Sequence, residues 1–143
     1  MFNEKPELII NIPSKTELLK MVVELTRHIV TMNQFGPVCI QQIPVAVDEA
    51  ITNVIKHSYQ YKSDRDIRLE YYTHPEAIKI KIIFSGIPPV FQEQGVDLKK
   101  MIKEKKKGGL GVNLMRKIMD SVIYKTEDNV NSCELIKWKM KKS

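Results

Sequence analysis

The sequence predicts a two-layer α/β sandwich in which one mixed, mainly antiparallel sheet is covered on one face by helices. Two observations predict it. Apolar residues recur at helical spacing in three segments, and short apolar or alternating runs separated by turn residues form pairs that resemble hairpins. The elements follow one another as β-α-α-β-β-loop-α-β-β over 143 residues, a length typical of one domain.

The first strand and helix are expected near the N-terminus. Glu7–Ile12 alternates loosely and should form a short strand that Pro13 closes. Ser14 is a candidate N-cap with Glu17 as its capping-box partner, so we expect a helix from Lys15 to Met32. Its apolar residues fall at helical spacing: Leu18, Met21, Val22, Leu25 and Ile29.

A second helix and a hairpin follow. The helix is expected from Val38 to Tyr59, with Pro44 marking either a kink or a fresh start inside it. Its core face comprises Val47, Ile51, Val54 and Ile55. Two strands, Ile67–Thr73 and Ala77–Phe84, are joined by the three residues His74 to Glu76, which favours a hairpin.

A long polar segment separates this hairpin from the last elements. Residues 90–107 are charged and poorly periodic, and such loops inside compact domains are usually functional. A third helix is expected over Gly109–Asp120. The last two strands are expected over Ser121–Thr126 and Cys133–Met140, joined through Glu127–Ser132.

Composition is ordinary for a globular protein, with 43% apolar and 28% charged residues. No apolar run approaches the roughly 18–20 residues that cross a bilayer, and Met1–Pro6 lacks the shape of a signal peptide. We therefore expect a cytoplasmic protein with no membrane partner. Cys39 and Cys133 lack metal-ligand spacing and are interpreted as small apolar residues, buried or half-buried.

Much of the net charge of +6 lies in two segments, Lys99–Lys107 and Lys137–Lys142. A basic excess favours nucleic acid, anionic lipid, acidic proteins or polyphosphate ligands, and the plain alternative is a solvated surface. No recognised nucleic-acid motif is present, so we expect no direct nucleic-acid partner. The first segment differs from the second because it runs straight into glycines.

Three polar residues of the second expected helix, Glu49, Asn53 and His57, are spaced four apart and share one stripe. An amide oxygen suits a hard cation such as Mg²⁺, and a carboxylate one turn away can position or deprotonate a hydroxyl nucleophile. The same spacing is common on an ordinary exposed helix face, so this pattern alone leaves both interpretations open.

A glycine-rich turn opens the third expected helix. Its residues are Gly108, Gly109, Leu110 and Gly111, preceded by Lys105, Lys106 and Lys107. Backbone N–H groups, a helix N-terminus and full positive charges can therefore converge on one anion. Phosphate binding and a plain flexible loop are the alternatives here. The turn is not a Walker motif, because no Gly-Lys-Ser/Thr follows the glycines.

Together, in this order, these segments resemble a known family. Glu49-Ala50-x-x-Asn53-x-x-x-His57-x-Tyr59 looks like the N-box of the gyrase, heat-shock chaperone, histidine kinase and mismatch-repair ATPases. The segment from Gly108 to Asp120 looks like their second glycine box, in the long form that resembles the bacterial anti-sigma factor serine kinases. The resemblance covers about residues 7 to 140.

The resemblance implies a single histidine-kinase-like ATPase domain over residues 1–143, of the Bergerat type, with a lid loop around 90–108. ATP and Mg²⁺ would bind between the sheet, the N-box helix and the lid. Asn53 would coordinate Mg²⁺, and Glu49 would act as the general base toward a protein hydroxyl. The nucleotide-binding residues implied are Asn53, His57, Gly86, Lys107, Gly108, Gly109, Leu110 and Gly111.

The resemblance also implies partners. Members of this family bind a sigma factor and phosphorylate a serine or threonine of an anti-sigma factor antagonist, so that ATP chemistry changes which protein is held. The expected function is therefore an anti-sigma regulatory factor with serine/threonine protein kinase activity and partner-switching control of transcription. Relatives often dimerise, and the sequence leaves both a monomer and a homodimer open.

Position 84 departs from the family pattern. The first glycine box of these relatives reads Asp-x-Gly-x-Pro, whereas this chain reads Phe84-Ser85-Gly86-Ile87-Pro88. A phenylalanine cannot accept the hydrogen bond that the aspartate takes from the adenine amino group. A buried group left without its partner costs about 1–3 kcal/mol, or roughly one to two decades of affinity. The alternative function is therefore a catalytically degenerate protein-binding regulator with weak or absent ATP binding.

Overall fold

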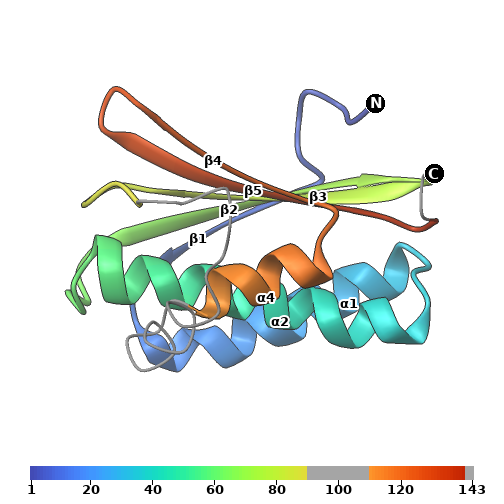
Figure 1. Ribbon diagram of the computed structural model, residues 1–143, viewed down its shortest axis with the longest axis horizontal. Helices are drawn as coiled ribbons and strands as arrows, with labels where there is room; N and C mark the ends of the chain where they lie inside the picture. The colour runs from blue at the N-terminus through green and yellow to red at the C-terminus, as the bar shows by residue number, and fades with distance from the viewer. Residues whose placement is uncertain (90–109, 141–143) are drawn as a thin grey trace.

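The computed structural model describes residues 1–89 and 110–140. Within these ranges one five-stranded sheet, in the order β1-β2-β3-β5-β4, is covered on one face by helices (Figure 1). The strands are β1 Leu8–Pro13, β2 Asp66–His74, β3 Ala77–Phe84, β4 Ser121–Glu127 and β5 Val130–Trp138. The helices are η1 Thr16–Leu18, α1 Leu19–Met32, α2 Pro37–Asn53, η2 Val54–Ser58 and α4 Leu110–Ile118. Every described strand pair is antiparallel, so the predicted two-layer sandwich is confirmed.

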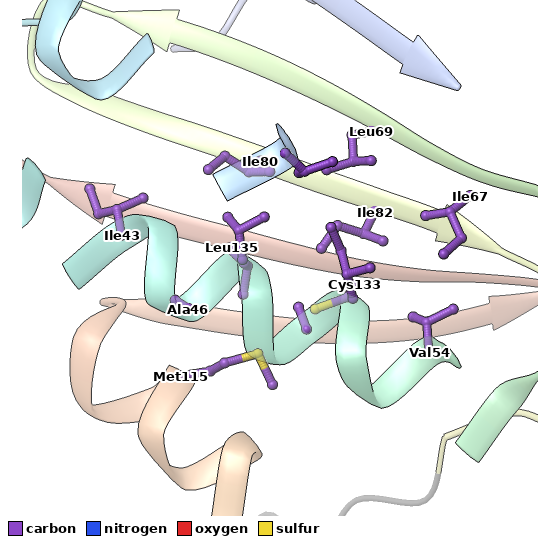
Figure 2. Packing of buried hydrophobic residues seen from close by; sticks show 14 of the residues in the cluster. Ile43, Ala46, Val54, Ile67, Leu69, Ile80, Ile82, Met115, Cys133 and Leu135 are labelled. Atoms are coloured by element: carbon purple, nitrogen blue, oxygen red, sulfur yellow. The ribbon is translucent and has the colours of Figure 1, made fainter. Parts of the chain in front are cut away.

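The core lies between the helices and one face of the sheet. Alternation along the central strands puts one set of side chains on that face, all of them 3% exposed or less: Ile67, Leu69, Tyr71, Ile78, Ile80, Ile82, Phe84, Cys133 and Leu135. Figure 2 shows sheet residues such as Ile80 and Ile82 on the side of the sheet that faces Ile43 of α2 and Val54 of η2, with Met115 of α4 on the far side of α2. The helix α2 therefore lies between α1 and α4 and contacts both.

Helix α1 is attached to the sheet by a buried polar link as well as by apolar packing. Its buried side chains Val22, Thr26 and Val30 recur every four residues and face the sheet. The Thr26 hydroxyl donates to the Val22 carbonyl at 2.7 Å, so the hydrogen bond of 2.8 Å between Thr26 and Tyr71 is donated by the tyrosine. Burial raises the pKa of Tyr71 to about 12.

Helix α2 begins one residue before its predicted start, with Pro37 in the first turn after Gly36. Pro44 is buried inside it, and the helix is continuous from Pro37 to Asn53, so Pro44 does not mark a fresh start. The last turn widens into the π-helix η2, in which the Tyr59 N–H donates to the Val54 carbonyl at 2.9 Å. Single π-turns inside helices are frequent at functional sites.

The predicted capping box at Ser14 is wrong. Lys15, rather than Ser14, precedes the first helical turn, and no side chain caps that turn. The Ser14 hydroxyl instead donates to the Lys62 carbonyl at 2.5 Å and accepts the Arg65 N–H at 3.1 Å. It therefore joins the end of β1 to the loop before β2, because these distant backbone groups compete successfully for its hydroxyl.

The connection between the last two strands is shorter than predicted. The expected loop over Glu127–Ser132 is wrong, because β5 already begins at Val130. Only Asp128 and Asn129 turn the chain, with φ angles of 51° and 65°. Two consecutive positive φ angles are the geometry of a tight hairpin turn, which Asp and Asn tolerate better than most residues.

The two cysteines behave as small apolar side chains. Cys133 lies in the core, where burial raises the pKa of its thiol to about 12, and the half-buried Cys39 packs against that core. Both thiols are free. Among the described helices, none is both long and apolar enough to cross a bilayer.

Candidate functional site

The helix α2 carries two of the three residues predicted to share a polar stripe. Glu49 and Asn53 are one turn apart near its C-terminal end, and both are half-buried. His57 falls in the π-helical turn η2 and is exposed. The neighbouring carboxylate, Asp48, forms a hydrogen bond with Thr52 one turn along the helix. Burial raises the pKa of Asp48, and this hydrogen bond opposes the rise. Glu49 is therefore the carboxylate on the Asn53 side of the helix.

The amide nitrogen of Asn53 is buried and has no hydrogen-bond partner within residues 1–89 and 110–140. An unpaired buried amide is rare in folded proteins and costs about 1–3 kcal/mol, so it needs an explanation. An amide offers an oxygen to a hard cation and an N–H to an anionic oxygen. Asn53, with the carboxylate of Glu49 one turn away, is therefore suited to hold a cation together with a phosphate group.

The predicted glycine-rich turn leads into α4. Lys107, Gly108 and Gly109 lie outside the described residues, as does the expected lid loop around 90–108. Leu110 and Gly111 belong to the first turn of α4, which packs against α2. The two helices run in roughly opposite directions, so α4 begins toward the end of α2 that carries Asn53 (Figure 1). The positive end of the α4 dipole is therefore placed on the same side of the molecule as Asn53.

Gly86 makes a close approach, but to the protein's own backbone. Its φ is +86°, and a Cβ atom there would lie 2.4 Å from the Ser58 carbonyl oxygen. The same oxygen accepts the Ile87 N–H at 3.0 Å. We call this contact between η2 and the end of β3 the Ser58–Gly86 clasp. It fixes the C-terminal end of the α2–η2 helix against the end of β3.

Tyr59 reinforces the clasp, a role that the sequence did not reveal. Its hydroxyl accepts the Ser85 N–H at 2.8 Å and donates to the Asp66 carbonyl at 2.5 Å. A cavity of about 410 Å³ lies against it, lined among others by Lys62 and Arg65. Glu49 and Asn53 do not line this cavity, so it is distinct from the polar stripe of α2.

Phe84 lies on the helix-facing side of the sheet, next to the clasp. It is 3% exposed and belongs to the core, with Ile67 as its neighbour on β2 and Asn131 on β5. Asn131 is 1% exposed, and the sequence pattern did not identify it as a candidate site residue. Its amide oxygen accepts the Thr126 hydroxyl at 2.8 Å, and its nitrogen lies 3.4 Å from the Gly86 carbonyl.

The described residues thus form a two-layer α/β sandwich in which Glu49 and the buried Asn53 amide nitrogen, unpaired within residues 1–89 and 110–140, lie on a helix that packs beside α4. The sequence profile of the histidine kinase-like ATPase domain matches residues 12–137. The chain therefore belongs to the histidine kinase-like ATPase domain family.

Similar curated proteins share a name. The chain is 25% identical over 130 residues to a protein named serine-protein kinase RsbW from Listeria monocytogenes, covering 87% of this chain and 83% of the relative. It is 29% identical over 132 residues to the protein of the same name from Halalkalibacterium halodurans, covering 88% and 80%.

Solved structures agree in fold. A chain of the SiaB–SiaC complex from Pseudomonas aeruginosa superposes with a TM-score of 0.62 at 13% identity, covering 93% of this chain and 90% of that one. A Mycobacterium tuberculosis chain with RsbU and RsbW domains gives 0.60 at 10% identity, covering 91% of this chain and 31% of that one. The catalytic domain of histidine kinase ThkA gives 0.53 at 12% identity, covering 92% and 96%.

The family implies ATP and Mg²⁺, and the two ends of the site fit them unequally. The metal and phosphate end fits, because the buried amide nitrogen of Asn53 lacks a partner among the described residues and Glu49 lies one turn away. The end of the site expected to hold the adenine base does not fit the family pattern. Position 84, where the relatives have an aspartate, is occupied here by Phe84, whose ring lies in the core.

Proposed function

We propose that this protein is an anti-sigma regulatory factor that transfers phosphate from ATP to a serine or threonine of a protein antagonist. The observation that carries the proposal is the buried amide nitrogen of Asn53, which has no partner within residues 1–89 and 110–140 and lies one turn from the half-buried Glu49. Support comes from the histidine kinase-like ATPase family and from relatives named serine-protein kinase.

Each residue has a distinct role in this proposal. The Asn53 amide oxygen would hold Mg²⁺, and the backbone of Gly108 to Gly111, with Lys107, would hold the phosphates. When bound, the cation neutralises phosphate charge and aligns the transferred group. Glu49 accepts the proton of the attacking hydroxyl. His57, exposed at the rim, contacts the nucleotide from the π-helical turn.

The proposal extends to the cellular setting. We propose that the protein is a single cytoplasmic domain over residues 1–143. Its proposed partners are a sigma factor and an anti-sigma factor antagonist. A homodimer completes the proposed assembly. Phosphorylation of the antagonist would release it and leave this protein free to hold the sigma factor.

A phosphate-transfer assay tests the proposal. The protein is incubated with labelled ATP, Mg²⁺ and the cognate antagonist, beside the variants Glu49→Gln and Glu24→Gln. Glu24 is a matched control, because it lies on α1 in an exposed ion pair with Arg27. Transfer should occur with wild type and Glu24→Gln and fall at least about 100-fold with Glu49→Gln, as expected for loss of a general base. No transfer by wild type, or equal transfer by Glu49→Gln, would reject the kinase.

Phe84 favours a second candidate, a protein-binding regulator of the same fold with weak or absent ATP binding. Titration calorimetry with Mg-ATP and Mg-ADP separates the two candidates. Tight binding that collapses in Asn53→Ala rules out this regulator, whereas undetectable binding beside retained sigma-factor binding supports it.

A further inference from the structure

Buried polar groups at the two ends of the candidate site differ in whether they already have partners. At the end of β3, the described groups are engaged by the protein itself. The Tyr59 hydroxyl accepts the Ser85 N–H and donates to the Asp66 carbonyl, and the Ser58 carbonyl accepts the Ile87 N–H. The side chain of Asn131, which is also buried there, is held by Thr126 and Gly86.

Phe84 lies beside these groups, next to Ser85 in the chain and opposite Asn131 on β5, and its side chain has no hydrogen-bonding atom. Its ring shares the helix-facing side of the sheet with Ile67 and Ile82, and it is 3% exposed. A phenylalanine side chain has no hydrogen-bond donor or acceptor, so Phe84 cannot distinguish an exocyclic amino group of a base from a carbonyl oxygen. That distinction separates adenine from guanine, and it needs a hydrogen bond to the base edge.

The opposite end of the site has the free hydrogen-bonding capacity. The Asn53 amide nitrogen is the buried side-chain polar atom that lacks a partner in residues 1–89 and 110–140. Glu49 lies on the same helix face. The groups that suit these side chains, a divalent cation and phosphate oxygens, are the same in every nucleoside triphosphate.

We propose that this protein recognises the magnesium-triphosphate part of its nucleotide and does not select adenine over guanine. The proposal rests on the proposed function, because it assumes that a nucleotide binds beside Asn53. It deepens that function by assigning Phe84 as the residue that removes base selectivity, so that the donor is any purine nucleoside triphosphate.

Binding measurements on the full chain test this directly. Titration calorimetry gives Kd for Mg-ATP, Mg-GTP and Mg-tripolyphosphate on the wild type. The ATP and GTP values should agree within about threefold, and tripolyphosphate should bind as well. Asn53→Ala should weaken ATP and GTP by the same factor, about tenfold or more. A wild-type preference for ATP over GTP of about tenfold or more would overturn the proposal.

Variants at position 84 provide the second arm. Phe84→Asp should introduce a preference for ATP of about tenfold, because a carboxylate accepts the adenine amino group and repels the guanine oxygen. Phe84→Leu, which keeps the core apolar, should leave the ATP to GTP ratio unchanged. Circular dichroism checks that each variant folds, and the wild-type ratio decides the matter if Phe84→Asp does not. An altered ratio in Phe84→Leu would count against the proposal.

The outcomes also separate this proposal from the kinase on which it rests. Equal binding of ATP and GTP without phosphate transfer rejects the kinase and keeps the inference. Selective binding of ATP with transfer keeps the kinase and rejects the inference. If wild type binds neither nucleotide nor tripolyphosphate, both are rejected.

Discussion

The carbonyl oxygen of Ser58 lies against Gly86, so closely that a Cβ atom at position 86 would stand 2.4 Å from it. This contact joins the end of the helix that carries Asn53 to the end of the strand that carries Phe84. The two ends of the candidate site are thereby held together by backbone atoms. Changes at Gly86 should therefore affect both the fold and the site.

Gly86→Ala should lower the free energy of unfolding by about 1–3 kcal/mol, because it adds a clash and a strained positive φ. Urea denaturation measures the change. Gly36→Ala is the matched control, since its Cβ would meet nothing within 4 Å and its φ is −70°. The control should stay within about 1 kcal/mol of wild type. Equal losses in the two variants would contradict the role of the clasp.

The pair Thr26 and Tyr71 should respond asymmetrically to mutation. Thr26→Val leaves the buried Tyr71 hydroxyl without its acceptor and should cost about 1–3 kcal/mol. Tyr71→Phe should cost less than about 1.5 kcal/mol, because Thr26 keeps its bond to the Val22 carbonyl. The double variant should lose less than the sum of the two. A larger loss in Tyr71→Phe than in Thr26→Val would show that the donor has been misassigned.

Alkaline pH should destabilise the protein partly through Tyr71. Its pKa rises from 10.0 in the unfolded chain to about 12 in the folded one, so above pH 10 the unfolded state binds fewer protons. The group's contribution to stability is thus full below pH 10 and declines by about 1.4 kcal/mol per pH unit until about pH 12. Tyr71→Phe should reduce the slope of unfolding free energy by that amount. Parallel slopes for variant and wild type would refute this.

Asn53 and Asn131 should differ in what they contribute to folding. Asn131→Leu removes an amide that Thr126 and Gly86 engage, and should lower stability by about 1–2 kcal/mol. Asn53→Leu removes an amide whose nitrogen has no partner among the described residues, and it should leave stability unchanged or raise it by up to about 1 kcal/mol. Thermal denaturation compares the two. A destabilised Asn53→Leu would mean that the amide serves the fold rather than a ligand.

The hairpin β2–β3 shows how much of the fold local pattern determines. Ala77–Phe84 was predicted with the bounds that the structure has, and β2 extends the predicted strand by one residue at each end. The reason is physical: Ile67, Leu69 and Tyr71 alternate along β2, as Ile78, Ile80 and Ile82 do along β3, and a shift by one residue would move these sets off the helix-facing side of the sheet. The same alternation places Phe84 with Ile78, Ile80 and Ile82, so its burial could have been predicted.

Ser14 and the β4–β5 turn show where local pattern fails. The Ser14 hydroxyl bonds residues 48 and 51 positions away, which no local capping rule can anticipate. Asp128 and Asn129 make a tight turn without glycine, so the usual turn signal was absent and the predicted loop was too long.

The candidate site divides in the same way. The proximity of Glu49 and Asn53 could be predicted from their spacing, because one helix carries both. The clasp and the contacts of Asn131 could not be predicted, because each joins segments that are distant in the sequence and meet only in the folded chain. The functional roles of these residues, and of Lys107 to Gly109 outside the described ranges, stay predictions.

The thiol of Cys133 can report the separation of the helical layer from the sheet, because it is buried between them. The thiol is fully buried and its raised pKa keeps it protonated, so a thiol reagent should modify the half-buried Cys39 first. Cys133 becomes reactive when sheet and helices separate. In a Cys39→Ser variant, the labelling rate therefore measures the free energy of separating the two layers, with no added probe. Slower labelling in the presence of a nucleotide would show that the ligand also holds these layers together.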